Sequence, residues 1–368
     1  MSALEEKLKE LRDEYAKTKH NKATNKHLGI LRRKMANIRK EMTKKSGGRG
    51  VGFAVKKTGD STVVLVGFPN AGKSSLLSAI TNAESEIAAY EFTTLDVIPG
   101  TISYGGAQIQ LLDVPGLIEG ASEGKGGGAK VASVIRVADM LLIMLDVNKP
   151  EGLFSLLDEL YGLGIRANVD RPGIRIEKKA TGGVEIDAMG HKIPLRKEIL
   201  EVLGASSIYN CRIIFQKDSS IEDISDFLDP SVVYLKALII LNKIDSVPRS
   251  FWEGIKKEVE TSTGIKTIPI SASNKTNTES LKAQIFGELG LLRIYLKPKD
   301  AEPDMKKPII AKTGATVLDV ARVLHSKTAK SLKYAYINGK SAKFTNQRFG
   351  KEHVVEDGDI VTLVYDKS

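Results

Sequence analysis

The stretch from Gly67 to Ser74 constrains the fold of this chain more than any other. It reads Gly-Phe-Pro-Asn-Ala-Gly-Lys-Ser and fits the phosphate-binding pattern G-x-x-x-x-G-K-S/T. A β-branched run, Ser61–Val66, precedes it, and Ser75–Ile80 follows with the apolar spacing of a helix. A glycine loop between strand and helix directs backbone N–H groups and the positive helix end at an anion. The sequence therefore predicts a nucleoside triphosphate site.

Two side chains of this loop have expected roles in phosphate chemistry. Lys73 is expected to reach the β and γ phosphates, and the Ser74 hydroxyl is expected to ligate Mg²⁺. After the first helix, the pair Thr93-Thr94 offers one hydroxyl that could close on Mg²⁺ and the γ phosphate. A threonine pair alone is weak evidence, because most threonines are strand formers or caps, and either residue could be the ligand.

A second motif lies about forty residues after the loop. The apolar run Ile109–Asp113 is expected to be a strand that ends in a carboxylate, and Val114-Pro115-Gly116 follows. Asp113 is placed to hold the Mg²⁺ shell, and the Gly116 amide is placed to sense the γ phosphate. A strand-terminal Asp is common, whereas D-x-P-G at this spacing is not.

The next residues lack the usual water-orienting side chain. Leu117 stands after Gly116, where many switch GTPases carry a glutamine. A glycine-rich run from Glu119 to Gly128 follows, which is too flexible to hold one shape without a ligand. An apolar Leu117 cannot orient water, so either hydrolysis is slow or another element supplies that function.

The choice of base is predicted at Asn242-Lys243-Ile244-Asp245, after the apolar strand Leu238–Leu241. The Asp245 carboxylate can accept hydrogen bonds from guanine N1–H and the exocyclic amine. Adenine would leave it unpaired, at a cost of about 1–3 kcal/mol. Lys243 can lay its stem on the base, and Asn242 can brace the phosphate loop. Ser271-Ala272-Ser273, after a strand over Ile265–Ile270, is suited to offering a backbone amide to guanine O6.

Composition sets the class of protein. The chain has 368 residues, with 42% hydrophobic and 27% charged residues, as in an ordinary soluble globular protein. A single cysteine, Cys211, excludes an internal disulfide, and five scattered histidines offer no zinc spacing. No apolar run approaches membrane-spanning length, and charges from Glu5 onward do not fit a secretory signal. These features predict a protein of the reducing cytoplasm.

The net charge of +10 is concentrated at the N-terminus. Residues 1–50 hold 15 Lys and Arg against 6 Asp and Glu, which leaves +1 for the remainder. Two apolar stripes at helical spacing, Leu4–Tyr15 and Leu28–Met42, predict a basic helical hairpin over residues 1–48. Its outward lysines and arginines suit RNA phosphates, although charge runs are usually only a solvated face.

The remainder predicts an α/β domain over residues 53–290 with an insertion at 165–232. The strands Leu141–Val147 and Leu238–Leu241 should be neighbours, yet about ninety residues separate them. We expect Ile174–Lys178 and Val184–Asp187 to form a hairpin around Thr181-Gly182-Gly183, completed by a helix and a strand. Residues 291–368 predict a ββαβββ β-grasp module with a strand at His353–Val355. We assign binding roles to both small modules.

The motifs GFPNAGKSSLL, FTTL, DVPGLIEGASEGKGGG, NKID and SAS resemble the developmentally regulated GTP-binding proteins, an Obg-type branch of GTPases. The resemblance covers the whole chain and implies a P-loop GTPase domain, an N-terminal helix-turn-helix arm, a ribosomal-protein-like insertion and a C-terminal TGS domain. It also implies cytoplasmic action on translating ribosomes, with the ribosome or its RNA contacted through the basic N-terminal arm and the TGS domain, and no membrane partner. In some lineages it further implies a small stabilising partner protein. Leu117 agrees with this family, whose members lack the catalytic glutamine. The guanine nucleotide positions it implies are Gly67, Phe68, Pro69, Asn70, Ala71, Gly72, Lys73, Ser74, Ser75, Asp113, Gly116, Asn242, Lys243, Asp245, Ser271, Ala272 and Ser273, with Mg²⁺ at Ser74, Asp113 and Thr93 or Thr94.

Asn70 suggests a monovalent cation. It occupies the phosphate-loop position where, in related GTPases, an asparagine helps to bind K⁺ against the nucleotide. The alternative is that Asn70 only caps or braces the loop.

Together these features predict a slow, K⁺-stimulated GTPase that acts as a switch on ribosomes or ribosomal RNA. The competing class is a GTP-regulated RNA-binding scaffold with negligible hydrolysis. A metabolic kinase is disfavoured, because N-K-x-D and D-x-P-G together serve switching.

Overall fold

The computed structural model describes residues 59–81, 98–114, 128–298, 301–324 and 328–366, together with Glu6, Glu10, Leu11, Glu14 and Ile38. The predicted hairpin over 1–48, Thr93, Thr94 and Gly116 lie outside these described residues. The chain divides into two compact units. The smaller comprises Met1–Ala54, Gly120–Arg136 and Asp158–Tyr234, and the larger comprises Val55–Glu119, Val137–Leu157 and Leu235–Ser368.

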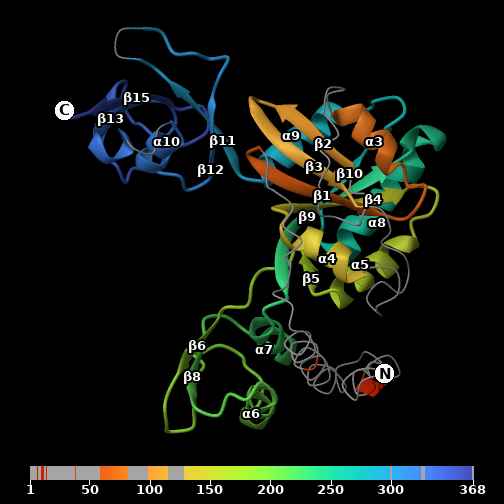
Figure 1. The fold of residues 1–368 in the computed structure, drawn as a ribbon. Helices are drawn as coiled ribbons and strands as arrows, with labels where there is room; N and C mark the ends of the chain where they lie inside the picture. The colour runs from red at the N-terminus through yellow and green to blue at the C-terminus, as the bar shows by residue number, and fades with distance from the viewer. Residues whose placement is uncertain are drawn as a thin grey trace. The chain divides into compact units, whose positions relative to one another are not determined.

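The main sheet of the larger unit follows the strand order β10-β9-β4-β1-β3-β2 (Figure 1). Its strands are β1 (Ser61–Gly67), β2 (Ile98–Tyr104), β3 (Ala107–Asp113), β4 (Met140–Asp146), β9 (Val233–Asn242) and β10 (Thr267–Pro269). All neighbours pair in parallel except β2, an antiparallel edge strand on β3. This confirms the predicted α/β class with a mostly parallel, doubly wound sheet.

The central strands are buried because both sheet faces are apolar. Every residue of β1 is buried, and so are the first six residues of β4. Helices α3 (Lys73–Ile80) and α9 (Thr278–Glu288) contribute Leu76 and Leu281 to one hydrophobic core with the strands. The larger unit also holds the 3-10 turn η1 (Ile244–Ser246) and α8 (Arg249–Thr263), and α5 (Gly152–Gly162) begins in it. Helix α4 (Gly128–Arg136) and the short strand β5 (Ile165–Ala167) belong to the smaller unit.

The strands on either side of the insertion are neighbours, as the spacing predicts. β4 pairs in parallel with β9 over seven residues, from Met140 opposite Lys236 to Asp146 opposite Asn242. The carboxyl ends of β4 and β9 therefore meet at one edge of the sheet, beside the end of β1.

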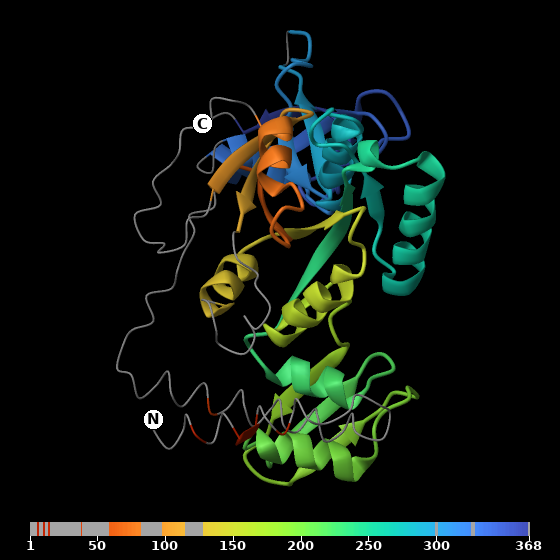
Figure 2. The same ribbon diagram turned by 90° about the vertical axis from the view of Figure 1, so that its right-hand side faces the viewer.

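The smaller unit holds a separate three-stranded sheet, drawn in green in Figures 1 and 2. Its elements are β6 (Ile174–Lys178), β7 (Val184–Asp187), α6 (Arg196–Ala205), β8 (Cys211–Phe215) and α7 (Ile221–Leu228). Side chains of both helices, among them Val202 and Ile224, share one core with Phe215 of β8.

The predicted hairpin of β6 and β7 is wrong. The strand order is β6-β8-β7, so β8 lies between them, antiparallel to β6 and parallel to β7. The glycine turn therefore crosses over β8, and its backbone is hydrogen-bonded to residues at the start of β8. The N–H of Gly183 donates to Asn210 Oδ1 at 2.9 Å, and the N–H of Cys211 donates to the Gly183 carbonyl at 3.1 Å.

The C-terminal residues of the larger unit form a second sheet of five strands, in the order β12-β11-β15-β13-β14. Its elements are β11 (Leu291–Leu296), β12 (Ile309–Lys312), α10 (Val317–Leu324), the 3-10 turn η2 (Thr328–Ser331), β13 (Leu332–Asn338), β14 (Gln347–Phe349) and β15 (Ile360–Tyr365). Helix α10 lies against this sheet (Figure 1), and its Val317, Val320 and Ala321 share one hydrophobic core with the strands.

The predicted strand at His353–Val355 is wrong, and the fourth strand of the β-grasp module is β14. Residues 353–355 instead bond to the start of α10. The Val355 N–H donates to the Ala315 carbonyl at 3.0 Å, and the Val317 N–H donates to the His353 carbonyl at 2.9 Å. Val355 is buried without belonging to a strand, which explains the misleading apolar signal. Within the described part of the chain, no helix is long and apolar enough to cross a membrane.

Candidate nucleotide-binding site

The phosphate loop is shaped by two residues with left-handed backbone. Asn70 has φ 64°, and Gly72, which caps α3, has φ 98°. A Cβ on Gly72 would lie 2.3 Å from the side-chain nitrogen of Asn242, and one on Gly67 would lie 2.6 Å from the Met144 carbonyl oxygen. Only glycine fits at either position, because both the backbone angle at Gly72 and the close approaches exclude a side chain.

The start of α3 is open to an anion. Its cap, Gly72, offers no side-chain hydrogen bond to the first turn, and no acidic residue lies in that turn. Ser74 and Ser75 are exposed there. Backbone N–H groups at a helix start need acceptors, and together with the helix dipole they favour phosphate.

Lys73 is held over the loop by backbone oxygens. Its Nζ donates to the carbonyls of Gly67 at 2.9 Å and Phe68 at 3.2 Å. Burial lowers the pKa of Lys73, and the nearby Asp113 carboxylate partly offsets that effect. A partly desolvated ammonium next to a free helix start is suited to the β and γ phosphates.

Asp113 lies at the end of β3 with an unsatisfied oxygen. The residue is 4% exposed, and its Oδ1 has no hydrogen-bond partner among the described residues. Burial raises the pKa of its carboxyl, while Lys73 acts in the opposite direction. A buried carboxylate oxygen without a partner costs about 1–3 kcal/mol.

That oxygen fits a divalent cation. Mg²⁺ is usually held by one or two protein oxygens together with water and substrate phosphates. Among the described residues, no group of three His, Cys, Asp or Glu side chains gathers as a metal site. Asp113 with the Ser74 hydroxyl would hold the ion, which would supply charge neutralisation at the phosphates.

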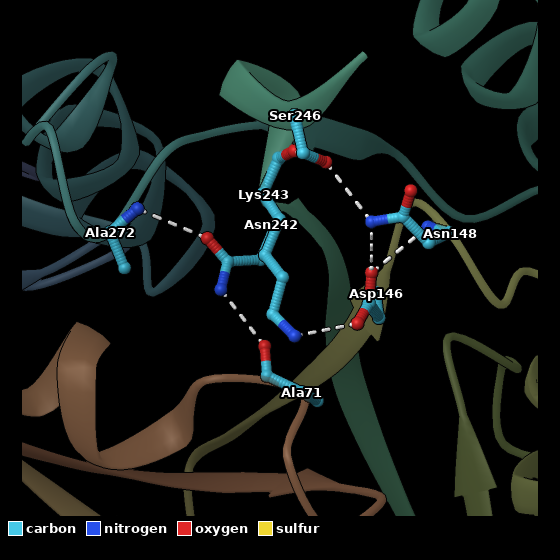
Figure 3. Close-up of polar contacts among 7 residues, drawn as sticks. All are labelled: Ala71, Asp146, Asn148, Asn242, Lys243, Ser246 and Ala272. Carbon is cyan, nitrogen blue, oxygen red and sulfur yellow. Dashed lines mark hydrogen bonds and ion pairs between the residues drawn. The ribbon is translucent and has the colours of Figure 1, made fainter.

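Asn242 joins three motifs that are far apart in the sequence. Its side-chain Nδ2 donates to the Ala71 carbonyl at 2.9 Å, and its Oδ1 accepts from the Ala272 N–H at 3.0 Å (Figure 3). Asn242 is buried, and so are both residues that it bonds. The phosphate loop, the N-K-x-D strand end and the Ser-Ala-Ser turn are thereby fixed to one another.

Lys243 is oriented by a network that sequence reasoning missed. Its Nζ lies 2.7 Å from Asp146 Oδ2, and Asp146 Oδ1 accepts from the backbone and side chain of Asn148 (Figure 3). The Asn148 amide also donates to the Ser246 hydroxyl at 3.0 Å. Burial opposes ionisation of Asp146, but the hydrogen bonds from Lys243 and Asn148 outweigh it and hold the Asp146 pKa below its ordinary value. One signal was available, because Asp146 ends β4 at the edge where β9 delivers Lys243.

Asp245 and the Ser-Ala-Ser turn lie at the same sheet edge. Asp245 is exposed in η1, directly after Lys243, whose left-handed backbone (φ 65°) turns the chain. Two amides of the turn already have acceptors, because the Ser271 N–H donates to the Thr276 carbonyl and the Ala272 N–H to Asn242. The Ser273 N–H has no acceptor among the described residues, so it is the turn amide left to meet guanine O6.

Asn70 takes no part in the hydrogen bonds that the described residues make within the loop. It is exposed and makes no hydrogen bond to any residue that the structure describes. The alternative in which Asn70 braces the loop therefore has no contact to support it in the described chain.

Comparisons with known proteins match nearly the whole chain. The family described as "50S ribosome-binding GTPase" matches residues 62–185, the C-terminal region of that domain matches 181–291, and a TGS domain matches 292–365. An uncharacterised GTP-binding protein of Methanocaldococcus jannaschii is 41% identical, covering 98% of this chain and 93% of its own. Developmentally-regulated G-protein 3 of Arabidopsis thaliana is 42% identical over 99% of both chains. Developmentally-regulated GTP-binding protein 1 of Xenopus laevis is 40% identical over 99% of this chain and all of its own.

Proposed function

This chain belongs to the family of developmentally regulated GTP-binding proteins, and on that premise we propose that it is a slow, K⁺-stimulated GTPase whose bound nucleotide controls engagement with ribosomes or ribosomal RNA. Its place of action in this proposal is the cytoplasm, where ribosomes translate. A small stabilising protein partner belongs to the same proposal.

The observation that carries the nucleotide part is the double contact of Asn242. It ties the loop that would cradle the phosphates to the strand end and turn that would read guanine. With Lys73 and Asp113 beside the loop, one site holds groups suited to base, phosphate and Mg²⁺.

Slow, cation-assisted hydrolysis is supported by two residues. Leu117 stands where many switch GTPases carry the water-orienting glutamine. Asn70, exposed and without a hydrogen bond to the described residues, has an amide oxygen free for a monovalent ion. Such an ion would help to neutralise charge that develops between the β and γ phosphates, as an arginine finger does elsewhere.

The cation proposal is tested by GTP hydrolysis at matched ionic strength in KCl and NaCl. We expect K⁺ to raise the rate, Na⁺ to leave it low, and Asn70→Ala to remove the difference. GDP affinity of the variant serves as the control and should be unchanged. Equal rates in the two salts would mean that a partner, and not K⁺, neutralises the charge that develops between the phosphates.

The ribosomal part is supported by the +9 charge of residues 1–50 and by the ribosome-binding description of the matched family. Co-sedimentation with ribosomes tests it in GTP-analogue, GDP and nucleotide-free states. The proposal expects a difference among the states, and identical binding in all three would contradict a switch.

Leu117 also favours a second candidate, an RNA-binding scaffold whose hydrolysis is negligible. Single-turnover hydrolysis with and without ribosomes separates the two. Stimulation by ribosomes supports the switch, whereas a negligible rate in both conditions supports the scaffold.

A further inference from the structure

The β2–β3 hairpin lies between the two motifs that are expected to sense the γ phosphate. β2 begins four residues after Thr94, and β3 ends at Asp113, three residues before Gly116. The two strands pair along all seven residues of each, beginning with Ile98 opposite Asp113. At about 3.3 Å per residue the hairpin spans roughly 20 Å. Because β3 runs parallel to β1, the tip of the hairpin lies at the sheet edge opposite the phosphate loop.

The tip of this hairpin is a tight two-residue turn. Gly105 (φ 58°) and Gly106 (φ 88°) connect the strands, and Tyr104 pairs with Ala107 across the turn. Left-handed backbone at both central positions is typical of a type I′ turn, which follows the twist of the strands. No further loop residues are present to absorb a displacement, so the tip moves together with the two strands.

The turn contacts the C-terminal five-stranded sheet, and both belong to the same compact unit. A Cβ on Gly106 would lie 2.5 Å from Pro308 Cγ, so the ring of this proline, directly before β12, covers the glycine closely. A Cβ on Gly105 would lie 3.3 Å from the Cδ of Arg293 on β11. The tip of the hairpin therefore packs against the first two strands of the C-terminal sheet.

Apolar and aromatic packing extends this contact into the core. Leu291 of β11 belongs to the hydrophobic core of the main sheet, and Ile310 of β12 packs against that core. The ring of Tyr104, the last residue of β2, lies with its centre 5.7 Å from that of Phe286 on α9. The Arg293 guanidinium carbon lies 5.5 Å from the centre of the same Phe286 ring. The hairpin and the C-terminal sheet thus share side-chain neighbours around their contact.

Arg293 carries the contact towards the middle of the C-terminal sheet. Its backbone N–H donates to Asp357 Oδ1 at 2.7 Å, and its guanidinium bonds both carboxylate oxygens, at 3.0 and 2.5 Å. The hydrogen bond from Arg293 holds the pKa of Asp357 below its ordinary value, so the pair stays charged at neutral pH. Asp357 lies three residues before β15, the central strand, so β11 and β15 are held together here.

A second contact joins the C-terminal sheet to the strand that leads into the phosphate loop. Lys312 Nζ, at the end of β12, lies 3.3 Å from Asp139 Oδ1. Asp139 Oδ2 accepts from the Thr62 N–H at 2.8 Å, and the Asp139 N–H donates to the Thr62 carbonyl at 2.7 Å. Thr62 is the second residue of β1, whose other end begins the phosphate loop. β12 is therefore held both at the hairpin tip and at the start of β1.

We propose that the β2–β3 hairpin transmits the state of the bound nucleotide to the C-terminal sheet through the packing of Gly106 against Pro308. This inference rests on the proposed function, because it requires the threonine pair and Gly116 to close on the γ phosphate of GTP and to relax after hydrolysis. Closure draws both near ends of the hairpin towards the phosphates, and the tight turn passes that movement to Pro308 and β12. Such coupling is reciprocal, so altering the contact changes the preference between GTP and GDP.

Hydrogen–deuterium exchange of the full chain with Mg²⁺ tests the proposal in nucleotide-free, GDP and GTP-analogue states. We expect amides at 102–109, 291–296 and 309–312 to exchange about fivefold faster or slower with GDP than with the GTP analogue, as for an ordinary coupling. β14, at the far edge of the C-terminal sheet, is the internal control and should stay within about twofold.

The same experiment separates failure of this coupling from failure of the proposed function. A nucleotide-dependent difference at the phosphate loop without one at 291–296 and 309–312 would overturn the coupling alone. If neither nucleotide protects the phosphate loop, the proposed function fails, and the coupling that rests on it fails with it.

Two glycine variants separate transmission through the contact from strain in the turn. Gly106→Ala places a Cβ 2.5 Å from the Pro308 ring, whereas Gly105→Ala meets the flexible Arg293 side chain at 3.3 Å. Both carry the strain of alanine at positive φ. By calorimetric titration, we expect Gly106→Ala to change the ratio of GTP-analogue to GDP affinity by about fivefold or more, and Gly105→Ala to keep it within about twofold. Equal ratios in the two variants would overturn the proposal.

Pro308→Ala removes the same contact from the other side and leaves the hairpin turn unchanged, so it serves if Gly106→Ala does not fold. The exchange difference at 309–312 should fall from about fivefold to less than about twofold, while the difference at 102–109 persists. Pro303→Ala, in the same connection between β11 and β12, is the matched control and should keep both differences. An undiminished difference at 309–312 in Pro308→Ala would overturn transmission through this contact.

Discussion

The two ends of the nucleotide site differ in how completely their polar groups are satisfied. At the base end, the Asn242 side chain bonds Ala71 and Ala272, and the Lys243 ammonium bonds Asp146, so each of these polar side chains has a partner within the protein. At the phosphate end, Asp113 retains an oxygen without a described partner, and the bonds that Lys73 makes to described residues go to the carbonyls of Gly67 and Phe68. The base end is thus formed in advance, whereas the phosphate end has groups whose best partners are the phosphates and Mg²⁺. Affinity for the base should therefore depend on keeping the contacts of Asn242 and Lys243 intact. Affinity for the phosphates should come from giving partners to the buried Asp113 oxygen and the Lys73 ammonium.

The largest effect is expected from Asn242→Ala, which removes the side-chain contacts that join the phosphate loop to the base end. Removing the amide leaves the Ala71 carbonyl and the Ala272 N–H buried without partners, at about 1–3 kcal/mol each. We expect the free energy of unfolding of the nucleotide-free protein to fall by about 2–4 kcal/mol in urea titration. Asn148→Ala, which removes an exposed amide bonded to Asp146 and Ser246 at the same end of the site, is the matched control. Equal losses in the two variants would show that the buried contacts of Asn242 contribute no more to stability than an exposed amide does.

Asp245→Asn tests whether the base end reads guanine. The substitution replaces an acceptor with a donor, so xanthine, which has a carbonyl in place of the amine, should become the preferred base. We expect GTP affinity to fall by about 5–150-fold, equivalent to about 1–3 kcal/mol. Affinities for GTP, XTP and ATP are the measurement. An unchanged GTP affinity would remove Asp245 from the pocket.

Asp113→Asn should act in opposite directions on stability and on ligand binding. Burial raises the pKa of the Asp113 carboxyl, so its ionisation costs folding free energy as pH rises above the ordinary value for aspartate. A neutral amide avoids that cost, and we expect the nucleotide-free variant to be about 1 kcal/mol more stable at pH 8. The gain should vanish below the ordinary aspartate pKa, where the wild-type carboxyl is protonated in both folded and unfolded states.

Adding GTP and Mg²⁺ supplies the control for this variant. Stabilisation by ligand should be greater for the wild type, because an anionic carboxylate binds the ion more strongly than a neutral amide does. Thermal unfolding with and without Mg²⁺ measures both effects. A variant that is less stable without ligand would mean that Asp113 is satisfied by groups outside the described residues.

The smallest effect is expected from Asp146→Asn, which loosens the support of Lys243 while keeping its shape. The Lys243 side chain is 38% exposed, so the ion pair contributes only about 0.3–1 kcal/mol. GTP affinity should fall by about 2–5-fold. Because the Asp146 pKa lies below its ordinary value, the wild-type contact persists at neutral pH and is lost only as pH falls through that lowered pKa. A wild-type affinity that declined between pH 8 and pH 6 would contradict this contact.

Local motifs predicted the main sheet better than the small modules. The β1 strand, the phosphate loop and α3 follow directly from the apolar run, the glycines and the helical spacing around Gly67–Ser74. The β4–β9 pairing follows from parallel-strand geometry across a long insertion. In the small module, the glycine turn between β6 and β7 predicts a hairpin. The strand β8, which comes later in the sequence, nevertheless lies between β6 and β7. Sequence separation hides such a pairing, because nothing local to β6 or β7 specifies β8.

The site itself was predictable where a motif marks it and hidden where partners come from another strand. Asn242 and Lys243 stand in a recognisable order, whereas Asp146 resembles any carboxylate at a strand end. Its role depends on the register that places it opposite Asn242, which only the folded sheet supplies. The predicted strand at His353–Val355 failed for a similar reason. Val355 is buried against the start of α10, and this burial gives the same apolar signal in the sequence as a strand does.

The pairing of β4 with β9 has a consequence for the order in which the chain folds during synthesis. The strand that completes the centre of the main sheet ends at Asn242, almost a hundred residues after β4. Until those residues leave the ribosome, β4 lacks one of its two neighbours, while all five elements of the small module between β6 and α7 have already emerged. Such long-range pairing is slow and leaves apolar strands exposed in the interval. Nascent chains arrested with residue 230 just outside the exit tunnel should therefore protect the inserted module from protease while β1 and β4 remain open to cleavage.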